Sequence, residues 1–240
     1  MTGESTSNAI TRKAVNLSLP APKAIIFDWD NTLVDSWACI QASMNATLIA
    51  MGHPPWDMAE TKARVAKSLR DSFPGLFGAR WPEARDLFYR EYRAIHLDYL
   101  KALDGAVFML NRLSEAGVKL GVVSNKNGDL LRQEAAQLGW EGYFARLVGA
   151  TDAVRDKPAT APITMVLDAV GLVPGPHVWF VGDAAIDMET AWNSGLFPLL
   201  LRDHPARDGE FGDFPPRLHL NSCRQLVDLV DKTLVPNSLI

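Results

Sequence analysis

The stretch AIIFDWDNTLVD, residues 24–35, says more about the fold than any other part of the chain. Its first four residues are apolar and Pro20 and Pro22 precede them, so we expect a short buried β-strand over residues 24–27. Asp28 and Asp30 follow two residues apart, which places two like charges on the same side of an extended chain. A bound divalent cation would relieve their repulsion, and so would a proton shared during catalysis. The alternative is a solvated turn that only ends the strand.

The rest of the chain alternates apolar runs with segments of helical spacing. We expect further strands at 118–123, 144–149, 177–181 and 197–201, and helices at 107–116, 128–138, 161–170 and 186–194. Glycines 117, 139, 171 and 195 stand where helix C-caps are expected. Strands that are apolar throughout and alternate with helices predict an α/β fold with a doubly wound parallel sheet covered on both faces.

Residues 37–103 interrupt this alternation. Helical spacing covers 38–51, 57–69 and 82–100, with turns expected at 52–55 and 73–75 and no convincing strand. We therefore expect a core domain made of residues 23–36 and 104–240, with an inserted all-α domain over 37–103. An insert just past the carboxyl edge of the sheet would cover a site there and exclude water from it. The polar, Ser- and Thr-rich start of the chain leads us to expect a flexible extension over residues 1–22.

The composition excludes several classes of protein. With 48% hydrophobic and 22% charged residues and a formal net charge of -4, the 240-residue chain has no basic footprint for nucleic acid or an anionic membrane. No apolar run approaches the roughly 20 residues that span a bilayer. The only two cysteines, Cys39 and Cys223, lie far apart in the sequence. We expect a cytoplasmic protein with reduced thiols that binds neither nucleic acid nor membrane.

Polar residues follow four of the predicted strands. They are Asp28 and Asp30, then Ser124 with Asn125, then Lys157 beyond a polar loop, then Asp183 with Asp187 four residues later. Taken singly, Ser124 is typical of a loop, Lys157 of a surface and Asp187 of the first turn of a helix. In doubly wound sheets, however, ligands bind beyond the carboxyl ends of the strands, so these residues are expected to lie together.

In order, spacing and position, these residues resemble the four motifs of the haloacid dehalogenase superfamily of phosphohydrolases, over about residues 23–201. The resemblance is greatest to the phosphoglycolate phosphatase-like branch, in which the helical insert is a cap on a Rossmann-like core. It implies Mg²⁺ bound by the carboxylates of Asp28 and Asp183 and by the backbone carbonyl of Asp30. Asp187 is then a supporting residue or an outer ligand of the metal.

Elementary chemistry agrees with the roles that this resemblance implies. A carboxylate can attack an anionic phosphate ester only where a cation neutralises the site. Asp28 would form an aspartyl-phosphate, and Asp30 would protonate the leaving alkoxide and later activate water. On the phosphate side, Lys157 would supply positive charge and Ser124 and Asn125 would hold oxygens.

Two smaller expectations concern the turn after Asp30. Thr32 would donate a hydrogen bond to Asp28 or to phosphate. Asn31 stands where many members of the superfamily carry glycine, and asparagine tolerates left-handed backbone better than most residues. Trp29 would either shape the leaving-group pocket or pack in the core.

The expected substrate is a small phosphorylated metabolite, either phosphoglycolate-like or sugar-phosphate-like, and the protein a monomer or a homodimer. Asp30 favours a phosphatase over a dehalogenase, because ester hydrolysis needs an acid at that position. A phosphonatase would use an insert lysine, but Lys62 and Lys67 are better explained as solvated helix charges. A phosphomutase and a non-catalytic binding protein stay open.

The insert offers one candidate for substrate selection. Arg70 lies where such caps read the substrate and could clamp a carboxylate or a second phosphate, although an ordinary helix-end arginine explains it equally well. The five histidines are scattered without metal-ligand spacing, and we assign them no role.

Overall fold

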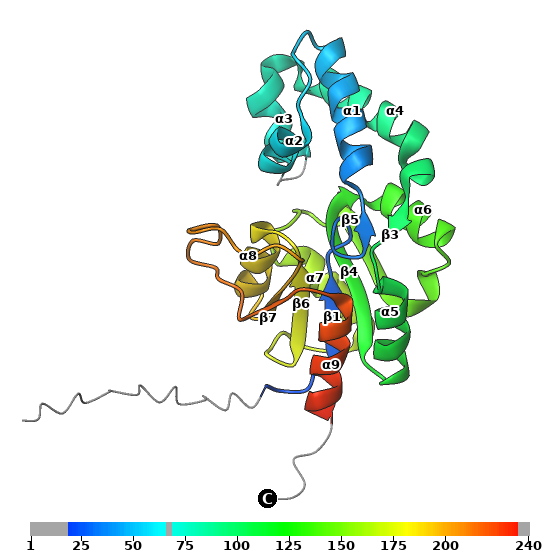
Figure 1. Ribbon diagram of the computed structural model, residues 1–240, viewed down its shortest axis with the longest axis vertical. Helices are drawn as coiled ribbons and strands as arrows, with labels where there is room; N and C mark the ends of the chain where they lie inside the picture. The colour runs from blue at the N-terminus through cyan, green and yellow to red at the C-terminus, as the bar shows by residue number, and fades with distance from the viewer. Residues whose placement is uncertain (1–18, 66–68, 235–240) are drawn as a thin grey trace, which may run out of the picture.

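The computed structural model describes residues 19–65 and 69–234, so most of the expected N-terminal extension lies outside the described residues. A six-stranded parallel sheet forms the core, in the order β5-β4-β1-β6-β7-β8 (Figure 1). Its strands are β1 (Ala24–Phe27), β4 (Lys119–Asn127), β5 (Phe144–Ala150), β6 (Val178–Gly182), β7 (Phe197–Leu201) and β8 (Leu218–Leu220). The predicted doubly wound α/β fold is confirmed.

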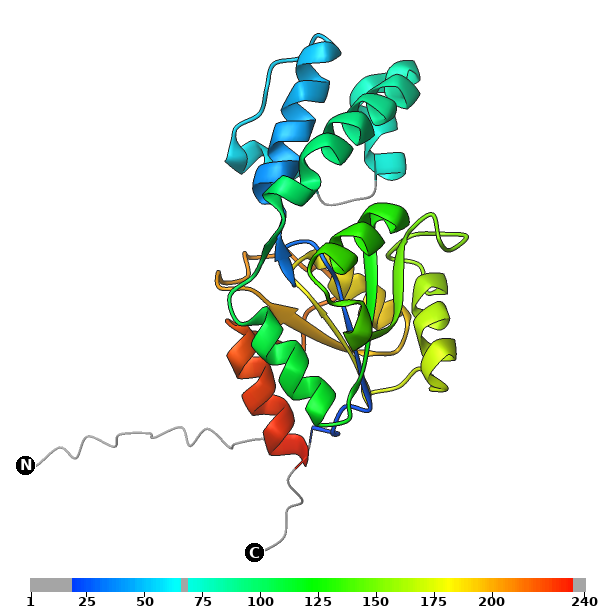
Figure 2. The ribbon, with the colours of Figure 1, turned by 90° about the vertical axis from the view of Figure 1, so that its right-hand side faces the viewer.

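Helices cover both faces of this sheet, which explains why its strands are apolar throughout. Ile25 and Phe27 of β1 pack with α5 (Ala106–Glu115) and α9 (Cys223–Leu234), whereas Ala24 and Ile26 pack with α7 (Ala161–Val170) and α8 (Ala185–Asn193). In Figure 2, α5 and α9 lie side by side on one face and α7 lies on the other. A strand with polar residues on either face would lose this burial.

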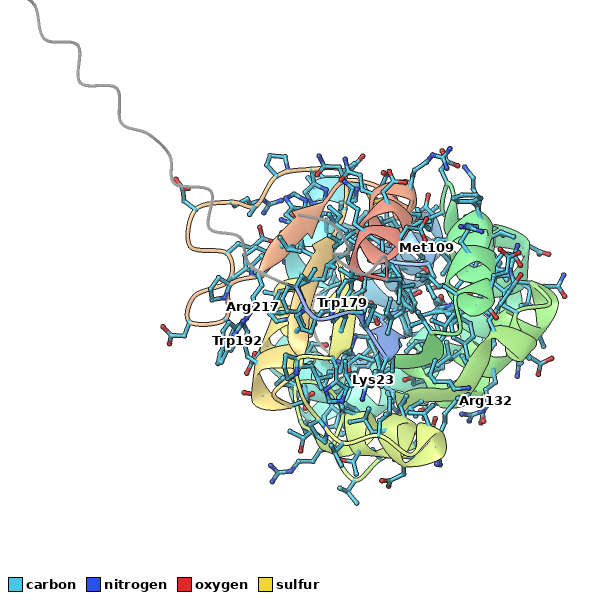
Figure 3. All side chains as sticks on the ribbon, turned by 90° about the horizontal axis from the view of Figure 1, so that it is seen from below. Lys23, Met109, Arg132, Trp179, Trp192 and Arg217 are labelled. Atoms are coloured by element: carbon cyan, nitrogen blue, oxygen red, sulfur yellow. The ribbon has the colours of Figure 1, made fainter. Side chains whose placement is uncertain are left out.

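The predicted core helices are confirmed to within a few residues at their ends. Besides α5, α7 and α8, they include α6 (Gly128–Gln137), followed by a short 3₁₀ turn at Glu141–Tyr143. The four expected C-cap glycines all have positive φ. Strand β8 and helix α9 were not predicted. At that edge Arg217 lies over the ring of Trp192, 5.2 Å from its centroid, as Figure 3 shows from the side opposite the insert.

The insert is a separate group of helices above the carboxyl edge of the sheet (Figures 1 and 2). It contains α1 (Trp37–Ala50), α2 (Met58–Arg64), α3 (Leu69–Phe77), a 3₁₀ turn (Gly78–Arg80) and α4 (Trp81–Tyr99). These helices bury a hydrophobic cluster that contains Met44, Leu48, Phe73 and Phe88, and Leu130 of the core helix α6 joins it. The inserted all-α unit is therefore confirmed, while its limits at 37 and 103 stay a prediction.

Three expectations for the insert were wrong. The helix expected over 57–69 ends at Arg64, and another helix, α3, begins at Leu69. The turn at 73–75 lies inside α3, where Phe73 and Phe77 are one turn apart, buried and in contact with each other. Their burial outweighs the turn preference of Pro74-Gly75. The insert was also expected to lack strands, but β3 (Lys101–Ala102) pairs antiparallel with β2 (Val34–Asp35) where the chain enters and leaves the insert. Two-residue strands are too short to show a period of two in the sequence.

Within residues 19–65 and 69–234, no helix combines the length and the apolar character needed to cross a membrane.

Candidate active site

Three carboxylates meet at the carboxyl edge of the sheet. Asp28 follows β1, Asp183 follows β6, and Asp187 lies in the first turn of α8. One oxygen from each lies within 4.8 Å of the others. The arrangement follows from the parallel register, since the backbone N–H of Asp28 donates to the carbonyl of Val181 on the neighbouring strand at 2.9 Å.

Lys157 is the cation of this cluster. Its buried Nζ lies 2.7 Å from Oδ1 of Asp28 and 2.7 Å from Oδ1 of Asp187. Asn125 holds the lysine backbone: its Oδ1 accepts from the N–H of Lys157 at 3.0 Å, and its Nδ2 donates to the Lys157 carbonyl at 3.3 Å. The ammonium is therefore fixed against both carboxylates.

Asp187 is held on both of its oxygens. Oδ1 accepts from Lys157, and Oδ2 accepts from the backbone N–H of Ala184 at 3.0 Å. Gly182 provides the room, because a Cβ at that position would overlap the carboxyl group of Asp187. Asp187 therefore contacts both Lys157 and the start of α8. In Asp28 and Asp183, by contrast, one carboxylate oxygen accepts no hydrogen bond from another described residue.

The raised pKa values of Asp28 and Asp183 indicate that the cluster has too little positive charge to balance its carboxylates. Burial raises the pKa of Asp28 to about 6, with Asp187 and Asp30 adding to the effect and Lys157 opposing it. Burial also holds the pKa of Asp183 well above its usual value, and the carboxylates of Asp187 and Asp28 raise it further. Oxygen donors of this kind are what a hard divalent cation prefers, so the residues present fit such an ion.

Asp30 is not one of the three grouped carboxylates and has partners of its own. Its Oδ1 contacts the hydroxyl of Ser36 and lies 2.7 Å from Nζ of Lys126. The next residue, Asn31, has a φ of 61°, so the expectation that asparagine adopts left-handed backbone here is confirmed. The turn thus separates the side chain of Asp30 from the three carboxylates.

A cavity of about 860 Å³ joins the site to the insert. Asp28, Asp30, Ser124, Lys157 and Asp183 line the side formed by the core. Trp37, Met44, Lys62, Tyr89 and Tyr92 line the side formed by the insert. The three carboxylates therefore lie in a chamber between the core and the insert.

Comparison with known proteins shows the family to which this chain belongs. The family described as haloacid dehalogenase-like hydrolase matches residues 25–199. The chain belongs to this family. A phosphoglycolate phosphatase of Xanthomonas campestris pv. campestris is 32% identical over 179 residues, which cover 73% of this chain and 80% of the relative. A phosphoglycolate phosphatase of Chromobacterium violaceum is 26% identical over 89% of this chain and 99% of its own length.

Solved structures agree on the fold. A hydrolase of the haloacid dehalogenase superfamily from Ehrlichia chaffeensis superposes with a TM-score of 0.62, at 26% identity, over 90% of this chain and 98% of that one. A haloacid dehalogenase-like protein from Streptococcus pneumoniae reaches a TM-score of 0.75 at 21% identity, over 87% and 98% of the two chains. The fold of this haloacid dehalogenase-like hydrolase therefore has structural counterparts over 87–90% of the chain.

Ser124 and Thr32, two of the predicted phosphate-binding residues, lie at the site of this hydrolase, and Thr32 has another partner than expected. Ser124 is buried beside the cavity, and its Oγ accepts from the backbone N–H of Lys126 at 3.3 Å. It follows the point at which β4 leaves its regular pairing with β5, a bulge that turns side chains toward the site. The hydroxyl of Thr32 donates to Oδ1 of Asp183 at 3.5 Å, and not to Asp28. The binding of phosphate by these residues stays a prediction.

Arg70 does not line this cavity. Its guanidinium pairs with the buried carboxylate of Asp156, and it borders a separate hollow of about 510 Å³ that also contains Pro158 and Asn193. Its proposed contact with substrate stays a prediction. Lys62 lies over the ring of Trp37, 5.3 Å from its centroid, while Lys67 is outside the described residues.

Sequence reasoning missed a second buried charge cluster next to the hydrolase site. Lys126 and Glu134 are buried, with Nζ of Lys126 2.6 Å from Oε2 of Glu134. Nε1 of Trp29 donates to the same oxygen at 2.7 Å, and the ring of Trp29 packs edge-on against Trp140, so the packing role expected for Trp29 is confirmed. His96, to which we assigned no role, lies 2.9 Å from Oε1 of Glu134. A charged residue on an amphipathic helix such as α6 gives no sign in the sequence that it is buried.

Proposed function

We propose that this hydrolase is a Mg²⁺-dependent phosphatase that cleaves a small phosphomonoester through an aspartyl-phosphate on Asp28. The observation that carries the proposal is the ammonium of Lys157 between Asp28 and Asp187, with the carboxylate of Asp183 beside them. A carboxylate nucleophile that faces a dianionic ester needs this ammonium and the further positive charge of a metal ion.

In the proposed reaction an oxygen of Asp28 attacks phosphorus, and the bond between phosphorus and the ester oxygen breaks. Asp30 donates its proton to that leaving oxygen, so the product departs as a neutral alcohol. Water then attacks the phosphorus of the aspartyl-phosphate, and Asp30 takes the water proton. The cycle ends with inorganic phosphate and both carboxyl groups in their starting states.

Three groups of residues support these steps. The carboxylates of Asp28 and Asp183 and the backbone carbonyl of Asp30 would hold the metal, which supplies positive charge against the phosphoryl oxygens. Lys157 keeps Asp28 ionised and oriented, since their atoms are 2.7 Å apart in a buried site. Ser124, Asn125 and Thr32 would bind phosphoryl oxygens.

The chamber and the relatives both support a small substrate. A cavity of about 860 Å³ under an insert suits a small metabolite rather than a polymer. Two relatives carry the name phosphoglycolate phosphatase, which favours phosphoglycolate or a similar small phosphate ester for this chain.

A substrate screen with and without Mg²⁺, run on wild type, Asp28→Asn and Asp208→Asn, tests the proposal. Asp208 is exposed and does not line the cavity, so its variant is a chemically matched control. We expect Mg²⁺-dependent phosphate release by wild type and Asp208→Asn, and none by Asp28→Asn. Wild-type turnover by Asp28→Asn would show that the nucleophile is wrong. Transfer of phosphate within a sugar would indicate a mutase, and Mg²⁺ binding without turnover of any ester a binding protein.

A further inference from the structure

Lys126 is a buried cation that the proposed reaction does not use. It lies two residues beyond Ser124 at the end of β4, and its side chain is only 4% exposed. Its Nζ is 2.7 Å from Oδ1 of Asp30 and 2.6 Å from Oε2 of Glu134. A buried ammonium of this kind persists only where carboxylates compensate it, so the three groups form one unit.

Glu134 anchors this unit and is itself fully held. Oε2 accepts from Nε1 of Trp29 as well as from Lys126, while Oε1 lies 2.9 Å from Nδ1 of His96 and 3.4 Å from the hydroxyl of Tyr92. The side chain of Glu134 is 1% exposed. With every oxygen in contact with a fixed partner, Glu134 has no freedom to move Lys126 away from Asp30.

Two of those partners belong to the insert. Tyr92 and His96 lie one turn apart on α4, stacked with ring centroids 5.5 Å apart, and α4 contacts α6, which carries Glu134. Nζ of Lys126 also lies 5.1 Å from the centroid of the Tyr92 ring. The place of Lys126 is therefore set jointly by the core and by the insert.

The two oxygens of Asp30 have different surroundings. Oδ1 is held by Lys126 and by the hydroxyl of Ser36, whereas among the described residues no group donates to Oδ2. The side chain keeps 20% of its exposure and lines the cavity. One anchored oxygen and one free oxygen is the arrangement that a proton donor to a bound substrate requires.

We propose that Lys126 is a positioning residue for the acid–base Asp30, and that Glu134, Tyr92 and His96 hold it in place. The inference rests on the proposed function, in which Asp30 protonates the leaving oxygen. Lys126 does not touch the reacting atoms; it fixes Oδ1, so that Oδ2 faces the substrate. Docking of α4 against Glu134 completes the arrangement.

Leaving-group dependence separates this role from a merely structural one. An alkyl phosphate needs the acid, because an alkoxide leaves poorly, whereas p-nitrophenyl phosphate needs it little. kcat/KM covers substrate binding and the phosphorylation step and is independent of the later hydrolysis of the aspartyl-phosphate. For Lys126→Met we expect kcat/KM to fall by at least about 10²-fold with an alkyl phosphate, the usual contribution of general acid catalysis, and by less than about 10-fold with p-nitrophenyl phosphate.

Matched variants make every outcome decisive. Lys119→Met, an exposed lysine of the same strand, should leave both values unchanged. Lys126→Arg, which keeps the charge, should recover part of the loss with the alkyl ester only. If Lys126→Met does not fold, as circular dichroism would show, the charge-balanced pair Lys126→Met/Glu134→Gln replaces it with the same expectation.

Asp30→Asn distinguishes a failure of the inference from a failure of the proposed function. If Asp30→Asn lowers kcat/KM equally for both esters, the acid role of Asp30 is wrong, and the proposed function with it. If Asp30→Asn is selective for the alkyl ester but the Lys126 variant lowers both values equally or neither, Lys126 does not position the acid. Selectivity in both variants supports the inference.

Discussion

Replacing Lys157 by methionine should destabilise the metal-free protein strongly. The change removes the one ammonium that lies 2.7 Å from both Asp28 and Asp187, and Lys157 is 2% exposed. The two carboxylates raise the pKa of this lysine above its usual value although burial lowers it, so the lost group is a full positive charge.

The size of the effect follows from the burial. Removal of one partner of a buried ion pair costs about 3–5 kcal/mol, and two carboxylates depend on Lys157, so we expect roughly 4–5 kcal/mol. In a chain of this size 1 kcal/mol corresponds to about 2–4 °C of Tm, which gives a decrease of roughly 8–20 °C. Mg²⁺ should raise the Tm of the variant more than that of wild type, because the unpaired carboxylates gain a new counter-charge.

Thermal unfolding followed by circular dichroism, in EDTA and then in excess Mg²⁺, measures both quantities. Lys119→Met removes an exposed lysine from β4 and should stay within about 0.5 kcal/mol of wild type. If Lys157→Met unfolds at the same temperature as Lys119→Met in EDTA, Lys157 does not hold the acidic cluster together and the electrostatic reasoning fails.

Two further predictions concern the supports of the site. Gly182→Ala would place a Cβ on the carboxyl group of Asp187. We expect the free energy of unfolding, measured by chemical denaturation, to fall by about 1–3 kcal/mol and kcat to fall at least 10-fold. Unchanged kinetics would mean that Asp187 is not needed to position Lys157. Arg202 donates from Nη1 to the backbone carbonyl of Asp183 at 2.9 Å and also pairs with Glu210. This pairing lowers the pKa of the Glu210 carboxyl from 4.5 to about 2. The ion pair therefore stabilises the fold above pH 4.5, and this contribution is lost as the pH falls toward 2. Glu210→Gln should therefore be less stable than wild type by roughly 2 kcal/mol at neutral pH, with the two unfolding curves meeting near pH 2; a constant difference at every pH would contradict the assignment.

The sequence predicts the sheet and its edge well because both depend on local signals. A strand such as β1 must be apolar on each side when helices cover both faces, and that pattern is visible in four residues. The polar residues after each strand then meet at one edge by topology alone. On this basis Asp28, Asp183 and Lys157 could be expected to lie close together before any distance was known.

The features that were missed depend on long-range contacts. Phe73 and Phe77 make α3 a helix by packing against the rest of the insert, against the local preference of Pro74-Gly75. The second charge cluster joins Lys126 and Glu134 to α4, which lies far away in the sequence. No period or spacing marks such residues, because their burial exists only after core and insert have come together.

The proposed function depends above all on the phosphorylation of Asp28 during turnover. Enzyme mixed with a good substrate and Mg²⁺, quenched within one turnover and reduced with borohydride, should contain homoserine in place of aspartate at position 28, because borohydride reduces an acyl phosphate but not a carboxylate. Asp28→Asn, treated identically, should show no conversion. Conversion of a different aspartate, or turnover in which wild-type Asp28 is never converted, would contradict the account.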